Sequence, residues 1–311
     1  MRRKVVSMNY PKKISIKVPA STGNVGSGFD CVGMAMDIWN EIEVSFNAQN
    51  LTIENQGIDV EKYQQISPED NFIIQGIRAI EPDIDINKIR VINNNRIPFS
   101  IGLGSSAAAL CAGLSIGNLL TDKKINEEEL STKAINIEGH PDNASPCFYG
   151  GLTISSFDQS GKRWITRKID LPEDLNVVIF VPNFTSATRE SRVQLPSKIE
   201  RRDVVHNLSR VALLIDCFIN KDFALLKHAT QDSIHQDVRF KNFPEMKSVL
   251  NAAINAGALG AILSGSGPAI MAFSQGNEFT INYEMEESAR KHNIEGNIIL
   301  TRPSNKGVTI T

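Results

Sequence analysis

The sequence lacks the marks of several large classes of protein. It contains no run of the roughly 18 to 20 consecutive apolar residues that a membrane-spanning helix needs. The basic residues at its start are not followed by an apolar stretch, so we expect no secretory signal. The cysteines show neither CxxC nor Cys/His metal-binding spacing, and most have small or apolar neighbours, as buried free thiols do. A reduced, cytoplasmic protein is expected from these four residues, Cys31, Cys111, Cys147 and Cys217.

An excess of charge of one sign is also missing. The 33 basic and 35 acidic residues give a formal net charge of -2, so the molecule as a whole has no basic surface for DNA or RNA. The one local excess, in residues 2–17, is typical of a solvated tail and a strand edge. We therefore expect a small-molecule partner, with no nucleic acid and no membrane.

Length and composition indicate a globular protein of two domains. A chain of 311 residues is long for a single core, and 41% hydrophobic residues supply ample material for two. Internal repeats and low-complexity linkers are missing, and the softest boundary is the turn-rich segment 156–172. We expect an N-terminal domain of residues 1–165 and a C-terminal domain of residues 166–311.

Hydrophobic periodicity predicts an α+β fold, because strands and helices are mixed rather than regularly alternating. Helical spacing predicts a helix over 70–80 with Asp70 as its N-cap, and a loop is expected at 140–146, HPDNASP. Two further helices are predicted, one buried and one amphipathic, over 107–120 and 125–139. Alternating or continuous apolar residues predict strands at 14–22, 39–46, 51–55, 88–93, 150–157 and 175–182.

The stretch Pro98 to Ala108, PFSIGLGSSAA, has the parts of an anion-binding loop. Gly102 and Gly104 allow left-handed backbone conformations and a close approach to a ligand. The following residues open a helix, whose first N–H groups have no partner within the helix and favour a phosphate. Ser105 and Ser106 add hydroxyls that can reach a phosphate oxygen or a magnesium ion. The same stretch is also compatible with a plain strand-to-helix turn capped by serines.

Two further glycine-rich loops favour a phosphate-bearing ligand. Residues 19–30, PASTGNVGSGFD, carry Asn24 and Asp30, which can face one polar ligand. Residues 263–269, LSGSGPA, lie between two apolar runs, and such loops at strand ends often bind ligands. Neither GxxxxGK[ST] nor GxGxxG occurs, which excludes a Walker loop and a dinucleotide fingerprint.

Together the three loops resemble the motifs of the GHMP kinases, in the same order and spacing, over about residues 14–275. Within that family, the resemblance is to its homoserine kinase branch. It rests on the segments VPASTGNVGSGFDCVGMAM, EGHPDNASPCFYGG, TRESRVQLP and QDSIHQDVR, a combination that mevalonate kinase and galactokinase lack. The first segment departs from the usual pattern at Gly23, Val25 and Ser27, where Ala, Leu and Pro are usual.

The resemblance implies two α+β domains with the site in the cleft between them. The N-terminal domain would be like ribosomal protein S5 domain 2 and the C-terminal domain ferredoxin-like. The implied reaction transfers the γ-phosphate of ATP to the side-chain hydroxyl of L-homoserine and yields O-phospho-L-homoserine for threonine synthesis, and the family suggests a homodimer. The ATP residues implied are Asn71, near the adenine, and, around the phosphates, Pro98, Phe99, Ser100, Ile101, Gly102, Leu103, Gly104, Ser105, Ser106, Ala107 and Ala108.

The resemblance also assigns the metal and the amino-acid substrate. Ser106 and Glu138 would hold Mg²⁺, a hard ion that takes oxygen ligands. Arg192 and Arg239 would clamp the substrate carboxylate, since guanidinium forks match carboxylates. The ammonium and hydroxyl groups would contact Asn24, Asp30, His140 and Asn143. Each of these side chains also has a plain structural reading, as a surface ion pair, a loop residue or a helix end.

The route of the hydroxyl proton stays open at this point. An alcohol is a poor acid, so Asp30 or Asp142 could act as a general base. The resemblance argues against a dedicated carboxylate base. We hypothesise that Asp30 and Asn143 orient the hydroxyl, that Thr188 stabilises charge on the transferred group, and that the proton passes to the phosphate.

Two other functions are compatible with the same loops. A GHMP kinase for mevalonate or a sugar would lack a reason for Arg192 and Arg239. A non-catalytic ligand sensor would have no need of the magnesium ligands Ser106 and Glu138.

Overall fold

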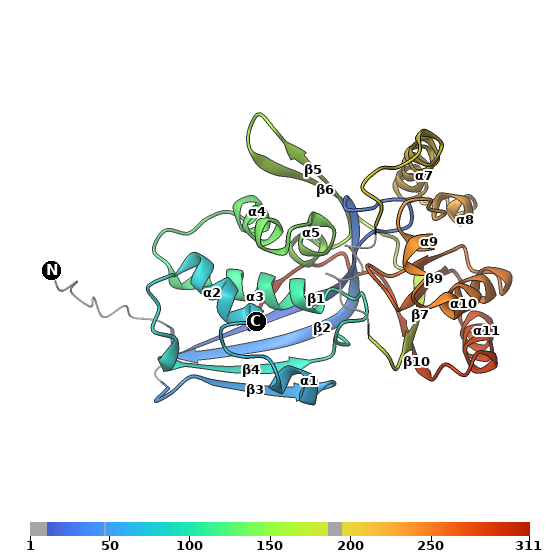
Figure 1. The fold of residues 1–311 in the computed structure, drawn as a ribbon. Coiled ribbons are helices and arrows are strands. Elements are labelled where there is room, and N and C mark those ends of the chain that lie inside the picture. The colour runs from blue at the N-terminus through green and yellow to red at the C-terminus, as the bar shows by residue number, and fades with distance from the viewer. Residues whose placement is uncertain (1–10, 47, 186–194) are drawn as a thin grey trace.

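Two β-sheets, each covered by helices, make up the fold (Figure 1). The computed structural model describes residues 11–46, 48–185 and 195–311. Within those residues the first sheet has seven strands and the second has four. The mixed α+β architecture expected from the sequence is confirmed.

The first sheet is organised around its longest strand, β2. One end of β2 pairs with β5 and the other with β4, while β1 runs antiparallel along it. The order is β11-β1-β2-β4-β3. In addition β5 pairs with β2 and β6 pairs with β5, and of the pairs in this sheet only β3 and β4 are parallel. The bounds are β1 Lys13–Thr22, β2 Val32–Phe46, β3 Thr52–Gly57, β4 Ile89–Asn95, β5 Leu152–Asp158, β6 Arg163–Ile169 and β11 Thr309–Ile310.

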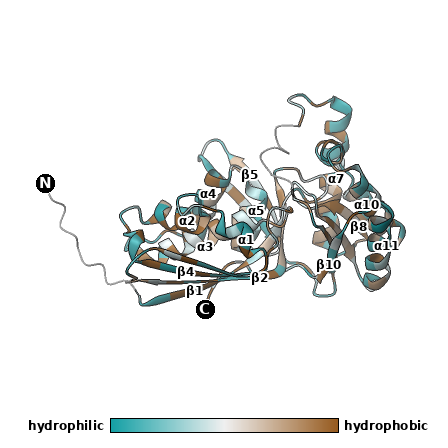
Figure 2. Cartoon of the chain, turned by 60° about the horizontal axis from the view of Figure 1, so that its bottom comes forward, coloured by the Kyte–Doolittle hydropathy of each residue, from teal (hydrophilic) through white to brown (hydrophobic). Residues whose placement is uncertain are grey.

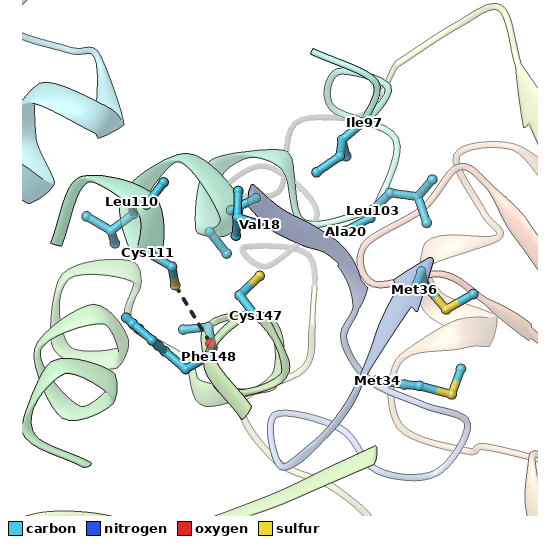
Figure 3. Close-up of a cluster of buried hydrophobic side chains, with 14 of the residues drawn as sticks. Val18, Ala20, Met34, Met36, Ile97, Leu103, Leu110, Cys111, Cys147 and Phe148 are labelled. Carbon is cyan, nitrogen blue, oxygen red and sulfur yellow. Dashed lines mark hydrogen bonds between the residues drawn. The ribbon is translucent and has the colours of Figure 1, made fainter. Parts of the chain in front are cut away.

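Helices α2 to α5 cover one face of this sheet (Figure 1). The central helix, α3, buries most of its circumference, as its small apolar residues predict. Figure 3 shows side chains of β1, α3 and α5 in one cluster, with loop residue Leu103 beside Ala20. The bounds are α1 Val60–Gln64, α2 Phe72–Ile80, η1 Ile86–Lys88, α3 Ser105–Leu120, α4 Glu127–Glu138 and α5 Pro141–Tyr149.

The second sheet has the strand order β10-β7-β9-β8, all antiparallel, which is the ferredoxin-like order. Val178 and Phe180 of β7 pack into a core with α10 and α11, whereas Val177 and Ile179 join the core shared with the first sheet. Burial on both faces explains the continuous apolar run predicted for this strand. The bounds are β7 Asn176–Pro182, α7 Arg201–Asn220, α8 Leu226–Ala229, α9 Gln236–Arg239, α10 Pro244–Asn255, β8 Gly260–Leu263, β9 Ile270–Ser274, α11 Glu278–Lys291 and β10 Gly296–Thr301.

Hydropathy follows this layering. Figure 2 shows hydrophobic stretches along the strands of both sheets. The shared core contains residues of β1, α3 and α5 together with Leu214 and Phe218 of α7 and Met271 of β9. The two sheets are therefore linked by one continuous apolar interior.

Two local predictions are wrong. The N-cap of α2 is Asn71 rather than Asp70, because the Asn71 side chain accepts hydrogen bonds from the backbone N–H groups of Ile73 and Ile74. Residues 140–146 open helix α5 instead of forming a loop. Pro141 is its first residue, where proline costs nothing because that N–H would have no helical partner.

The domain boundary stays a prediction. The turn-rich segment 156–172 includes most of the hairpin of β5 and β6, and the division after residue 165 falls inside β6. The C-terminal strand β11 returns to the first sheet and pairs with β1.

Candidate active site

The three glycine-rich segments predicted from the sequence lie in contact with one another. The N–H of Gly265 donates to the carbonyl of Gly23 (3.1 Å), and the N–H of Ala269 donates to the carbonyl of Ile101 (3.2 Å). These backbone hydrogen bonds bring one end of each sheet to a common point. The segments are named here loop 1, loop 2 and loop 3, for residues 19–30, 98–108 and 263–269.

Loop 2 and loop 3 approach so closely that only glycine fits between them. Gly102 has a φ of 88°, and a Cβ there would overlap the carbonyl oxygen of Ser264. The Ser264 hydroxyl lies 2.7 Å from the Gly102 carbonyl oxygen and 2.9 Å from Oγ1 of Thr22. One serine thus joins all three loops.

Helix α3 points its N-terminus into this junction. Gly104 is the N-cap with a φ of 66°, and no side chain in the described residues caps the helix. The first amides of a sixteen-residue helix carry partial positive charge and favour an anion. Both glycines adopt the left-handed conformations expected from the sequence.

Residues of α1 and its N-cap, which lie outside the three motifs, form hydrogen bonds with loop 2. Tyr63 of α1 forms a short hydrogen bond with the hydroxyl of Ser105 and another, of 3.2 Å, with Oδ1 of Asn95. The carboxylate of Asp59 accepts from the N–H of Phe99 (2.9 Å). Burial raises the pKa of Tyr63 to about 12, so its hydroxyl stays protonated and hydrogen-bonding at neutral pH. Sequence reasoning missed Tyr63 and Asp59 because they lie 42 and 40 positions from their partners in loop 2.

A cavity of about 220 Å³ opens between the loops. Among its lining residues are these predicted site residues: Asn24, Asn71, Phe99, Ser100, Ile101, Gly102, Leu103, Gly104, Ser105, Ser106, Glu138, His140, Asn143 and Arg239. Four others do not line it, namely Asp30, Pro98, Ala107 and Ala108. The side chains of Ala107 and Ala108 are buried in the core, and the assignment of these two residues to the phosphates stays a prediction. Thr188 and Arg192 lie outside the described residues.

Ser106 and Glu138 come together as predicted for a metal site. The Ser106 hydroxyl donates to Oε1 of Glu138 at 2.8 Å, and both residues line the cavity. A hydroxyl and a carboxylate oxygen fit Mg²⁺, which usually takes one or two protein ligands and keeps waters. In the described residues, no cluster of three or more His, Cys, Asp or Glu forms an alternative metal site.

Asp142 organises the wall of the cavity from behind. Its side chain is completely buried, with Oδ1 at 2.6 Å from Nδ1 of His140 and Oδ2 accepting from the N–H of Asn24 (2.9 Å). Both carboxylate oxygens are therefore bound to protein groups. Burial raises the pKa of the neighbouring Cys31 thiol to about 11, and the charges of Asp142 and Asp30 add to the shift.

The substrate-side residues are set by similar contacts. Oδ1 of Asn143, in the first turn of α5, accepts from the hydroxyl of Ser21 at 3.1 Å. Asp30 lies at the end of loop 1, where its N–H donates to Oδ1 of Asn24 (2.9 Å). Arg239 is buried, and its NH1 donates to the carbonyl of Gly265 at 2.8 Å.

Part of the cavity lining is apolar. Tyr63, Phe72 and Phe99 line it, with Tyr63 and Phe99 in edge-to-face contact at 5.1 Å. Asn93 of β4 also lines it, is 4% exposed and donates from Nδ2 to Asn55. Its Oδ1 is buried and has no hydrogen-bond partner among the described residues. Asn93 could not be singled out from sequence, since it is one of three consecutive asparagines.

The comparisons with known proteins agree with this architecture. Residues 71–151 match the GHMP kinases N terminal domain and residues 214–287 match the GHMP kinases C terminal domain. The chain is 34% identical to the homoserine kinase of Caldicellulosiruptor saccharolyticus, with 96% of each chain covered. It is 40% identical to that of Caldanaerobacter subterraneus subsp. tengcongensis, with 84% of this chain and 83% of the relative covered.

Solved structures show the same relationship. The crystal structure of homoserine kinase from Cytophaga hutchinsonii superposes with a TM-score of 0.84 at 27% identity, covering 97% of this chain and 98% of that one. Mevalonate kinase from L. major, in complex with R-mevalonate, shares the fold at a TM-score of 0.68 and 17% identity, covering 96% and 98%. The chain belongs to the GHMP kinase family. The relatives that show this membership are homoserine kinases.

None of the helices in residues 11–46, 48–185 and 195–311 has the length and apolar character to cross a membrane.

Proposed function

We propose that this protein phosphorylates the side-chain hydroxyl of L-homoserine with ATP and yields O-phospho-L-homoserine for threonine synthesis. One observation carries the proposal. The uncapped N-terminus of α3 and the residues suited to an amino-acid substrate open into the same cavity. The homoserine kinases among the relatives, similar over most of both chains, support this choice of substrate within the family.

The phosphate end of the cavity suits the triphosphate of ATP. The first amides of α3 and the glycines of loop 2 offer N–H donors, and Ser105 and Ser106 offer hydroxyls. Phosphoryl transfer has a loose transition state, so the protein contributes mainly positioning and stabilisation of charge. Thr188 keeps its predicted role of stabilising that charge, as a residue outside the described ranges.

Ser106 and Glu138 are the residues that would hold Mg²⁺. Their side-chain oxygens are already within hydrogen-bond distance at the edge of the phosphate site. Bound Mg²⁺ would offset the negative charge of the ATP phosphates.

The amino-acid end is built around a carboxylate clamp. Arg239, together with Arg192 outside the described residues, would bind the substrate carboxylate. Asn24, His140 and Asn143 line the same cavity and offer polar groups to the ammonium and the hydroxyl.

The proton route follows from the contacts of Asp142. Both of its carboxylate oxygens are occupied by His140 and Asn24, which argues against its acting as a base on the substrate. In the proposed step, the hydroxyl oxygen forms a bond to the γ-phosphorus as the bond to the β–γ bridging oxygen breaks and ADP leaves. Asp30 and Asn143 orient the hydroxyl, and its proton passes to the transferred phosphate.

The apolar end would take the adenine. The buried Oδ1 of Asn93 is an acceptor suited to the exocyclic amino group of adenine, whereas guanine presents an oxygen at that place. Asn71, predicted near the adenine, also lines the cavity.

The test is an ADP-release assay with L-homoserine, L-threonine, mevalonate and galactose, each with Mg²⁺ and with excess EDTA. We expect turnover with L-homoserine that is lost on chelation. Release with mevalonate or galactose but not homoserine would indicate another kinase of the family. Release with none of the four would favour a ligand sensor.

We also propose that the protein is cytoplasmic. All four cysteines are free thiols in the structure, as is usual in a reducing cytoplasm. A homodimer is expected from the family resemblance, and sedimentation velocity of the purified protein measures its mass in solution.

A further inference from the structure

His235 occupies a buried position between loop 1 and Arg239. It immediately precedes α9, and its side chain has no exposure to solvent. Nε2 lies 3.0 Å from the carbonyl oxygen of Gly26 in loop 1. Nδ1 lies 2.9 Å from NH1 of Arg239. The imidazole of His235 therefore joins loop 1 to Arg239, the arginine proposed to bind the substrate.

The partners fix the protonation state of the ring. A carbonyl oxygen can only accept a hydrogen bond, and a guanidinium can only donate one. Nε2 of His235 must therefore carry the proton and donate to Gly26, while Nδ1 accepts from Arg239. Only the neutral imidazole satisfies both, because the imidazolium form has no acceptor.

The backbone of His235 is held by Asp232, and its ring is packed against Phe29. Oδ2 of Asp232 accepts from the N–H groups of His235 and Gln236, both at 2.8 Å, and its Oδ1 accepts from Nδ2 of Asn207 at 2.7 Å. The ring of Phe29 stacks on His235 with a centroid distance of 5.5 Å. These contacts leave the imidazole little rotational freedom.

Arg239 is positioned by the same group. It is 1% exposed, its NH1 is shared between His235 and the carbonyl of Gly265, and its guanidinium carbon lies 5.7 Å from the ring centroid of Phe29. A carboxylate bound by Arg239 would use the other N–H groups of the fork. The direction of those groups depends on how NH1 is held, because the guanidinium is planar and rigid.

We propose that His235 is a positioning residue, which as a neutral imidazole orients the Arg239 guanidinium toward the carboxylate of the amino-acid substrate and ties it to loop 1. The inference rests on the proposed function, because it assigns the substrate carboxylate to Arg239. Among the described residues, the His235 side chain hydrogen-bonds to Gly26 of loop 1 and to Arg239 and to no residue of loop 2, so its loss acts on the KM for the amino acid rather than on the KM for ATP.

Low pH disfavours the hydrogen bond between His235 and Arg239. Protonation of Nδ1 removes the acceptor of Arg239 and places a second cation beside it. Arg239 faces the ring from α9, and its charge disfavours protonation of His235. The carboxylates of Asp232, at 3.8 Å, and of Asp142 in α5 favour protonation. Burial is the main cause that lowers the pKa of His235, and the charge of Arg239 adds to it. Binding of the amino acid therefore weakens as the pH falls, and binding of ATP does so less.

Two substitutions separate the two ring nitrogens. His235→Asn places an amide oxygen near Nδ1 and keeps an acceptor for Arg239. His235→Gln places an amide nitrogen near Nε2, which keeps a donor to Gly26 but leaves Arg239 without its acceptor. His292→Gln, at an exposed position after α11, is the matched control. KM and kcat for L-homoserine and for ATP are measured at pH 7.5 and pH 6.

A hydrogen bond to a charged group leads us to expect a rise of about tenfold in the homoserine KM of His235→Gln, with the ATP KM unchanged. His235→Asn recovers most of that loss. In an Arg239→Lys background, the His235→Gln change has little further effect, because the two residues act together.

The outcomes test the positioning role of His235 separately from the proposed function. If wild-type protein turns over homoserine and His235→Asn is as impaired as His235→Gln, or if both raise the KM for ATP equally, the positioning role is wrong and the proposed function stands. If the wild-type protein does not use homoserine, the proposed function fails and this inference with it. A ¹⁵N NMR measurement that found Nδ1 protonated in the native protein would overturn the inference without any assay of activity.

Discussion

At the scale of single residues, the carboxylates of the site have two different roles. Some hold other protein groups in place through hydrogen bonds, and one is proposed to contact the substrate. The side chains of Asp142 and Asp232 are buried, and each accepts at least two hydrogen bonds from protein groups. Asp30 is only partly buried, at the end of loop 1. Asp30 does not line the cavity, and its proposed role is to orient the substrate hydroxyl, which an oxygen of asparagine would also do.

Asp30→Asn is therefore expected to raise the homoserine KM by about tenfold and to lower kcat by less than that, since an acceptor oxygen remains. Steady-state kinetics at saturating ATP measure both constants. Asp122→Asn, at an exposed turn, is the control. A loss of about 10³-fold in kcat would instead indicate that Asp30 is a general base.

Asn93→Leu is expected to reduce the preference for ATP over GTP by about three- to tenfold, the value of one hydrogen bond. The ratio of kcat/KM for the two nucleotides gives the preference. Asn94→Leu, on the opposite face of β4, should leave the ratio unchanged. An unchanged ratio in Asn93→Leu would remove Asn93 from the base site.

At the scale of elements, the site depends on how three loops pack rather than on any one of them. Backbone hydrogen bonds join loop 3 to loop 1 and to loop 2, and the Ser264 hydroxyl contacts both. The closest approach is at Gly102, where backbone conformation and lack of space both require glycine.

Gly102→Ala is expected to lower the free energy of unfolding by about 1–3 kcal/mol and to raise the KM for ATP, because the new methyl group displaces loop 3. Gly276→Ala is the matched control. Gly276 also has a positive φ, of 107°, but no atom lies within 4 Å of the added carbon. Equal effects of the two changes in urea denaturation and in kinetics would contradict a role for loop contact.

Most elements could be predicted from local pattern. The strand β1 and the helix α3 follow from alternation and from small apolar residues, since these patterns match strand and helix periods. The start of α5 could not, because Asp, Asn, Ser and Pro are typical of loops, and only its packing against β2 and α3 makes 140–146 helical.

At the scale of the whole molecule, one continuous core couples the two sheets, so groups buried between them affect global stability. His235 is such a group, neutral in the folded protein with its pKa lowered chiefly by burial. In the unfolded chain a histidine has a pKa of about 6.5. Below that pH the unfolded state binds a proton that the folded state does not, so stability falls with decreasing pH.

We therefore expect the free energy of unfolding to fall between pH 7.5 and 5.5 more steeply for the wild-type protein than for His235→Asn. The difference is at most about 1.4 kcal/mol per pH unit, the value for one proton. Urea denaturation at a series of pH values measures it, with His292→Asn as the control. Parallel curves for wild type and His235→Asn would show that His235 is not buried in its neutral form.

The sequence by itself determined the glycine loop that begins helix α3 and is proposed to bind phosphate, because left-handed glycines and a helix N-terminus are local properties of the backbone. The motif resemblance added the family. Only the tertiary structure decided which groups meet across long separations: Thr22 and Ser264 are 242 residues apart, and Gly26 and His235 are 209 apart. Such contacts depend on how two sheets bury their apolar faces in one core, and no local pattern encodes that geometry.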